Sequence, residues 1–228
     1  PLVSDKNSMS KKNISQEKII QAFISKSFEK SPGATSLSDI ADALEIKKAS
    51  LYNHFSSREA MYDATLYHCG NEIRSIHVLP EKSLESINSA KTTASAFFKK
   101  LLTRFFEMYE NEPLFEIYAF IHTEQYFNAD ALKIVETETE TISNDIKDIL
   151  QALAESGKIQ KKTEKEYKEY SSLITSLIFQ QRDAYIAARK ETLRQNPDCG
   201  VGSLFALPTD ETSLNRTVKL VDTVLKSL

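Results

Sequence analysis

The sequence predicts an all-α protein, and three observations support this class. Apolar residues recur at spacings of three and four along most of the chain, which is the period of a helix with one buried face. No segment alternates as a half-buried strand would, since both faces of ETETET at 136–141 are polar. The five glycines and six prolines cluster at the breaks that a helical chain needs. About nine helices are therefore expected.

Composition and charge narrow the class of protein. Hydrophobic residues make up 41% and charged residues 27%, as in globular domains. No apolar run is long enough for a transmembrane helix or a signal peptide, and the two cysteines, 130 positions apart, predict no disulfide framework. We therefore expect a cytoplasmic protein without membrane contact. From Ser10 to Ala60, eight Lys and Arg face six Asp and Glu in a chain of net charge −3. A slightly basic N-terminal segment in an acidic chain is compatible with DNA binding.

The first helices are expected between residues 14 and 45. Residues 14–30 carry one apolar stripe and form a supporting helix. The segment SLSDIADALE then begins with Ser36 and Asp39, which are spaced as in a capping box. Ile40 and Leu44 give this second helix a buried stripe, and the small Ala41 allows another helix to cross closely.

A second short helix is expected in IKKASLYNHFSSRE, residues 46–59. It starts near Lys47, buries Leu51 and Phe55, and stops before Ser56. Ser56 and Glu59 then form a capping box for the following helix. Two short helices joined by a tight turn, with a supporting helix in front, have helix-turn-helix spacing.

The outer face of this helix suits a DNA groove. At about 100° per residue, an inward Leu51 places Ala49 and Asn53 outward. Two small residues would let the helix backbone enter a major groove. Base edges would be contacted by Ser50 and Asn53. Phosphates would be contacted by Lys47, Lys48 and Tyr52.

Each of these residues also has a simpler structural explanation. Paired lysines on a surface helix are usually only solvated, Tyr52 fits a half-buried aromatic equally well, and His54 is more typical of a packed or capping histidine. The spacing, both capping signals and the Leu-Tyr-x-x-Phe anchor together favour DNA binding.

Residues 14 to about 65 resemble the TetR family of bacterial transcriptional repressors, from ISQEKIIQAFISKSF through TSLSDIADALEIKKASLYNHFSSREAMYDA. The resemblance implies a domain at 13–65 that binds double-stranded DNA, and a domain at 66–228 that binds an effector and dimerises. Residues 1–12 would be a disordered arm or a cloning remnant. The implied contacts are Ser36, Tyr52 and Arg58 to phosphates, and Lys48, Ala49, Ser50 and His54 to bases or the groove, with Lys47 at the start of the recognition helix.

Three positions depart from the family pattern. Glu45 stands where the turn usually has glycine, so a non-glycine residue is expected at positive φ, at a cost of about 1 kcal/mol. Arg58 replaces the commoner lysine and preserves its charge. Asn53 stands where an aromatic or basic residue is frequent, so operator specificity does not transfer from relatives.

The second domain contains two long apolar stripes, at 164–190 and 211–228. Each is long enough to pair with its own copy in a homodimer, which would bind a palindromic operator. The alternative is that both stripes only cover their own core. The family resemblance further implies that a small-molecule effector releases the repressor from DNA.

An aromatic-rich centre at 97–127 would line an apolar cavity or serve only as core. We expect an apolar or aromatic effector, and a cationic one if Glu116 and Glu124 face inward. The candidate effector contacts are Tyr62, Tyr67, Phe105, Tyr118, His122 and Gln180.

The sequence disfavours two other classes of protein. An enzyme is disfavoured because no histidine has a glutamate three residues before it, and Gly200-Val-Gly202 follows no strand. His68, Cys69 and Glu72 are the remaining metal candidates, without supporting geometry. A helical adaptor that does not bind DNA is disfavoured by Lys48 and Tyr52. No cofactor and no metal are expected.

Overall fold

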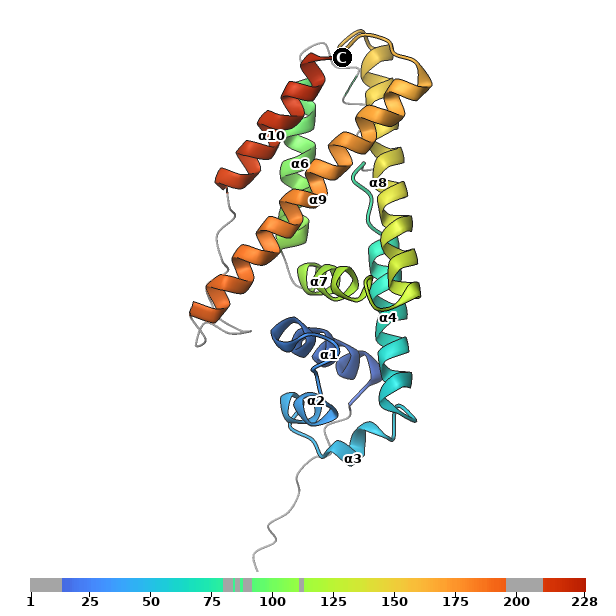
Figure 1. The fold of residues 1–228 in the computed structure, drawn as a ribbon, viewed down its shortest axis with the longest axis vertical. Coiled ribbons are helices and arrows are strands. Elements are labelled where there is room, and N and C mark those ends of the chain that lie inside the picture. The colour runs from blue at the N-terminus through green and yellow to red at the C-terminus, as the bar shows by residue number, and fades with distance from the viewer. Residues whose placement is uncertain (1–13, 80–83, 85–86, 88–91, 111–112, 196–210) are drawn as a thin grey trace, which may run out of the picture. The chain divides into compact units, whose positions relative to one another are not determined.

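The computed structural model describes residues 14–79, 84, 87, 92–110, 113–195 and 211–228. These residues form nine α-helices and no strand, which confirms the predicted all-α class (Figure 1). The chain divides into two compact units, one ending at His68 and the other beginning at Cys69. The arm expected at residues 1–12 lies outside the described residues.

The first unit contains α1 (Gln16–Lys30), α2 (Leu37–Ala43), α3 (Lys48–Leu51) and the start of α4 (Arg58–Arg74). The Ser15 hydroxyl caps α1 by accepting the Lys18 N–H at 3.4 Å. Three apolar side chains of α1 are fully buried, because their spacing puts them on one face of the helix: Ile19, Phe23 and Ile24.

The second unit contains the end of α4 together with α6 (Ala94–Glu110), α7 (Leu114–Glu124), α8 (Ala129–Glu155), α9 (Glu164–Gln195) and α10 (Glu211–Lys226). The long helices α8 and α9 pack together, α10 packs on α9 and α6, and α7 contacts both α6 and α8 (Figure 1). Gly157 ends α8 at a φ of 73°, a conformation in which glycine carries no Cβ penalty.

Two local predictions are wrong. The glycines are expected at breaks between helices, but Gly70 lies inside α4, where a Cβ would stand 2.8 Å from Cδ1 of Ile134 on α8. Glycine is therefore explained by close packing rather than by a turn. The capping residue of α4 is Ser57 instead of Ser56, since the Ser57 hydroxyl accepts the Ala60 N–H at 3.0 Å.

Candidate nucleic-acid interface and ligand pocket

The turn between α2 and α3 sets the direction of the second short helix. Glu45 has a φ of 56°, which confirms the predicted positive φ at this position. Its N–H donates to the Asp42 carbonyl at 3.1 Å, and the Ile46 N–H donates to the Ala41 carbonyl at 3.0 Å. These two bonds form a Schellman motif, whose left-handed residue is usually glycine. Ala41 is buried where the helices meet.

The start of α2 carries the predicted capping box. The Ser36 hydroxyl accepts the Asp39 N–H at 3.2 Å, and the Asp39 carboxylate accepts the Ser36 N–H at 2.8 Å. Lys30 forms an ion pair with the same carboxylate. The hydrogen bonds from Lys30 and Ser36 hold the pKa of Asp39 well below its usual range. Ser36 is exposed, while its hydroxyl already serves the cap.

The inward face of α3 is anchored in the first unit. Leu51 and Phe55 are buried, and the Gln16 amide donates to the His54 carbonyl at 2.8 Å. Arg58 donates to the carbonyl oxygens of Pro32 and Thr35 at 2.8 and 3.0 Å, so its guanidinium closes the loop before α2. This bonding gives Arg58 a structural role beside its predicted phosphate contact, which stays a prediction.

The outward face of α3 is open to solvent. Ala49 and Asn53 are exposed, as the helical geometry predicted, and Tyr52 keeps 52% of its surface accessible. The surface we call the α3 face combines two cations, a small residue and polar groups around one helix start. It consists of the exposed Lys47, Lys48, Ala49, Tyr52 and Asn53, with the partly exposed Ser50 and His54 at its edge. Contact between these residues and DNA stays a prediction.

A buried polar cluster occupies the second unit. Arg182 on α9 donates to the Glu138 carboxylate on α8 at 2.6 Å, with their side chains 1% and 3% exposed. The same carboxylate lies 2.9 Å from His122 Nε2 and accepts the Tyr109 hydroxyl at 3.1 Å. Residues from four helices, α6 to α9, therefore meet at one carboxylate. We call Arg182, Glu138, His122 and Tyr109 the polar cluster.

Burial and neighbouring charges determine the protonation states of Glu138 and Tyr109 in the polar cluster. Burial alone would raise the pKa of Glu138, but the charge of Arg182 and the hydrogen bond from His122 outweigh it and lower this pKa to about 2. Burial raises the pKa of the Tyr109 hydroxyl well above its usual value. Glu138 is therefore a carboxylate and Tyr109 a neutral phenol at neutral pH, which suits the hydrogen bond between them.

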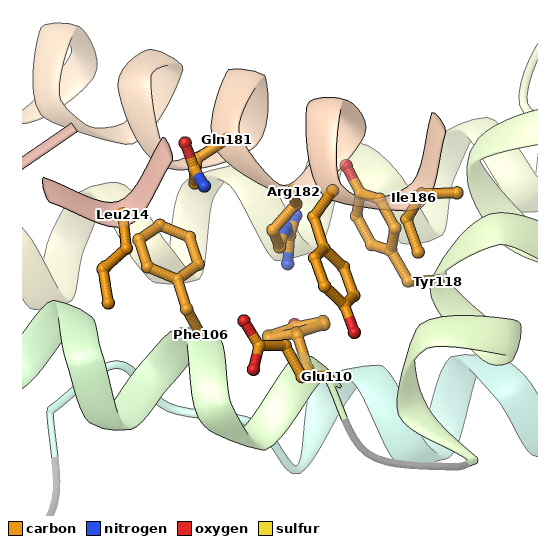
Figure 2. Close-up of a pocket in the computed structure, with 9 residues that line it drawn as sticks. Phe106, Glu110, Tyr118, Gln181, Arg182, Ile186 and Leu214 are labelled. Carbon is orange, nitrogen blue, oxygen red and sulfur yellow. The ribbon is translucent and has the colours of Figure 1, made fainter. Parts of the chain in front are cut away.

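A small pocket lies beside the polar cluster, with a cavity volume of about 10 Å³. Figure 2 shows Arg182 on α9 and Glu110 on α6 reaching into the same space from opposite sides. Apolar and aromatic side chains dominate the remaining walls. The lining residues are Phe106, Tyr109, Glu110, Tyr118, Gln181, Arg182, Tyr185, Ile186 and Leu214.

The predicted effector residues fall into separate places. Phe105 is buried in the core of the second unit, whereas Tyr118 lines the pocket and stacks with its ring centroid 3.8 Å from that of His122. Gln180 is exposed, and the lining residue is its neighbour Gln181. Tyr62 and Tyr67 belong to the first unit, where Tyr67 is 69% exposed.

A cationic effector was expected only if Glu116 and Glu124 face inward, and these two glutamates differ in burial. Glu116 is buried and Glu124 is partly exposed, and neither lines the pocket. Their positions therefore do not support a cationic effector in this pocket.

Sequence reasoning missed the residues at the centre of this site. Arg182 lies four residues after Ile178, in phase with the buried stripe of α9. Glu138 lies four residues before Ile142, in phase with the buried stripe of α8. A charged residue in phase with a buried stripe was the available signal, because a charge is seldom buried unless it is paired.

The described residues contain no group of three His, Cys, Asp or Glu placed to hold a metal ion. None of their helices is long and apolar enough to cross a membrane. Cys69, one of the former metal candidates, is buried, and burial raises the pKa of its thiol far above the usual value.

Comparisons with known proteins match the helix-turn-helix unit most directly. Residues 22–65 match the sequence family described as bacterial regulatory proteins, tetR family. The biofilm operon icaADBC HTH-type negative transcriptional regulator IcaR of Staphylococcus aureus is 34% identical over 95 residues, which are 41% of this chain and 51% of IcaR. The matched segment thus spans about half the length of this relative.

Solved structures resemble the fold over almost the whole chain. A protein from Mesorhizobium loti assigned to the TetR family has a TM-score of 0.60 at 16% identity, covering 93% of this chain and 95% of its own. A TetR transcription regulator from Haloarcula marismortui has a TM-score of 0.58 at 13% identity, with coverages of 93% and 97%. Residues 22–65 thus match the helix-turn-helix segment of the tetR family of bacterial regulatory proteins, and the described helices share the fold of these solved structures.

Proposed function

We propose that this chain is a transcriptional repressor that binds a palindromic operator as a homodimer and is released by a small-molecule effector. The observation that carries the proposal is the α3 face, which exposes Lys47, Lys48 and Tyr52 around the small Ala49. Its polar groups and cations suit base edges and phosphates. The relative IcaR is described as a negative transcriptional regulator, which supports repression.

The homodimer is part of this proposal, because one four-residue helix contacts too few base pairs for specificity. On α9 the predicted stripe has two parts: Ile174 and Ile178 are buried in the unit's own core, whereas Leu173 is 48% exposed. On α10, Leu220 is 40% exposed. These outward leucines favour pairing of α9 and α10 with a second copy.

Release by an effector needs a connection from the pocket to the DNA-binding unit. The helix α4 begins at Arg58 in the first unit and ends at Arg74 in the second. Within the second unit, Gly70 of α4 lies against Ile134 of α8. Glu138 of the polar cluster follows Ile134 by one helical turn on the same helix. A ligand that changes the position of α8 would thereby bias α4, and the affinities for ligand and DNA would be coupled.

The experiment measures fluorescence anisotropy of labelled DNA from upstream of the chain's own gene. Wild type should bind in a salt-dependent manner, and the Lys48→Ala, Tyr52→Phe double variant should bind about tenfold or more weakly. The matched control is Lys165→Ala with Tyr126→Phe, because both residues are exposed in the second unit. Equal affinity of wild type and the first double variant would refute DNA binding through the α3 face.

Dimerisation is tested separately by analytical ultracentrifugation. Wild type should sediment as a dimer, and Leu173→Glu with Leu220→Glu should shift it to monomer, since each charge would enter an apolar interface. A dimer that survives both substitutions would place the interface elsewhere.

A further inference from the structure

Arg182 has more hydrogen-bond donors than partners. Its Nη1 donates to Glu138 at 2.6 Å, whereas Nε and Nη2 are buried and have no hydrogen-bond partner. Buried polar groups almost always find a partner, because an unmade hydrogen bond loses the hydration of the donor without compensation. The two unused donors therefore mark a place where a bound molecule would supply the missing acceptors.

The geometry of the guanidinium limits which acceptor fits. Nε and Nη2 lie on one edge of the planar group and direct two N–H bonds almost in parallel. The ring centroids of Tyr118, Phe179 and Tyr109 lie 4.0, 4.4 and 4.5 Å from Cζ of Arg182. With aromatic rings packed so closely around it and Nη1 held by Glu138, the guanidinium is fixed in position. A carboxylate, with two oxygens in one plane, matches the free edge.

The pocket beside Arg182 measures only about 10 Å³, so the rest of such a molecule would have to displace side chains of the pocket wall. Arg182 is part of the lining and points into the pocket, as Figure 2 shows. Phe106, Ile186 and Leu214 line the same space and offer apolar surface to a hydrocarbon or aromatic body. The site thus joins an apolar wall to the fixed cation of Arg182, with Glu110 on the opposite side.

We propose that the effector is an apolar organic acid whose carboxylate accepts hydrogen bonds from Nε and Nη2 of Arg182. This inference rests on the proposed function and names the ligand class of its pocket. It departs from the cationic alternative, because a cation would meet the Arg182 charge without an acceptor for its donors. A neutral amide of the same shape offers one carbonyl oxygen in place of two carboxylate oxygens, so it should bind more weakly.

Glu110 provides a second test for a carboxylate in this pocket. Its side chain lines the pocket opposite Arg182 and would repel a bound carboxylate. Glu110→Gln should therefore tighten binding of the acid and leave binding of the amide nearly unchanged. Tighter binding of both, or of neither, would contradict a carboxylate in this pocket.

The test is isothermal titration calorimetry of the full chain with two matched pairs, octanoate with octanamide and cinnamate with cinnamamide. At least one acid should bind wild type about tenfold or more tightly than its amide. Arg182→Lys keeps a cation beside Glu138 but lacks the two-donor edge, so it should lose the preference for acid. Arg194→Lys, an exposed arginine of the same helix, is the control and should keep that preference.

The outcomes separate this inference from the proposed function. The inference is overturned if amides bind wild type as tightly as acids, if neither acid binds, or if folded Arg182→Lys keeps the preference. The acid-to-amide comparison on wild type needs no variant, so misfolding of Arg182→Lys would not remove the test. Operator binding is measured on the same preparation: DNA binding without acid binding refutes only the acid site, and acid binding without DNA binding refutes only the repressor.

Discussion

In the first unit most candidate functional side chains lie on the surface of one short helix and its turn, between residues 47 and 54. In the second unit they are buried and come from helices that are far apart in sequence, as with Glu138 and Arg182. The two sites therefore respond differently to substitution. Changes on the α3 face should alter DNA binding and leave the free energy of unfolding nearly unchanged, whereas changes in the polar cluster should alter stability first.

The largest expected effect is the loss of the buried carboxylate. Glu138→Gln leaves the Arg182 charge without its ion-pair partner at a position that is 1% exposed. Removing one partner of a buried ion pair costs about 3–5 kcal/mol. Urea denaturation should show this decrease in the free energy of unfolding. If Glu138→Gln were as stable as Lys48→Ala, the proposed contrast between the two units would fail.

The second effect is the pH dependence of the stabilisation that the Glu138 carboxylate provides. The folded-state pKa of Glu138 is lowered to about 2, whereas the pKa of an unfolded glutamate is about 4.3. The stabilisation, on the order of 3 kcal/mol, is fully present above the unfolded value and is lost as the pH falls towards the folded value. The stability deficit of Glu138→Gln should therefore shrink between pH about 4 and about 2. A deficit that stays constant over this range would contradict a charged Glu138 in the folded protein.

The third effect concerns the turn before α3. Glu45→Gly removes the Cβ at a φ of 56° and should stabilise the protein by about 1 kcal/mol. Lys47, with a φ of −76°, provides the matched control, because Lys47→Gly relieves no such conformation. Thermal unfolding checks both variants. A gain in thermal stability for Lys47→Gly, or no gain for Glu45→Gly, would contradict backbone strain at Glu45.

The smallest effect distinguishes two neighbouring serines. Ser57→Ala removes the hydroxyl that accepts the Ala60 N–H and should destabilise the protein by about 1 kcal/mol. Ser56→Ala should cost less, because Ser56 is exposed and precedes the cap of α4. The difference in denaturation midpoint measures the cap directly. Equal midpoints for the two variants would contradict the assignment of Ser57 as the capping residue.

The sequence was informative where a feature depends on residues close together in the chain. The Ser36 capping box, the strained Glu45 and the outward Ala49 all follow from spacings of a few residues, and the structure confirms them. The assignment of the α4 cap to Ser56 was wrong by one residue, because adjacent serines offer the same side chain to the helix start.

The pocket was less predictable because it depends on how distant helices pack. Arg182 and Glu138 are 44 positions apart, and no local spacing shows that they meet. The sequence predicts Gln180 as a contact, whereas its neighbour Gln181 lines the pocket, because a shift of one residue turns a helical side chain by about 100°. Ile134, the packing partner of Gly70, is 64 positions away in the sequence, so no local spacing distinguishes this packed glycine from a turn residue.

The central claim is that the α3 face approaches a DNA duplex, and Ala49→Glu tests it most directly. Ala49 is exposed, so a larger acidic side chain should fold normally but place bulk and negative charge against the groove. We expect operator affinity to fall by about a hundredfold or more, with an unchanged melting temperature. The same substitution at exposed Ala129 in the second unit should leave DNA binding intact. Wild-type affinity in Ala49→Glu would contradict the account.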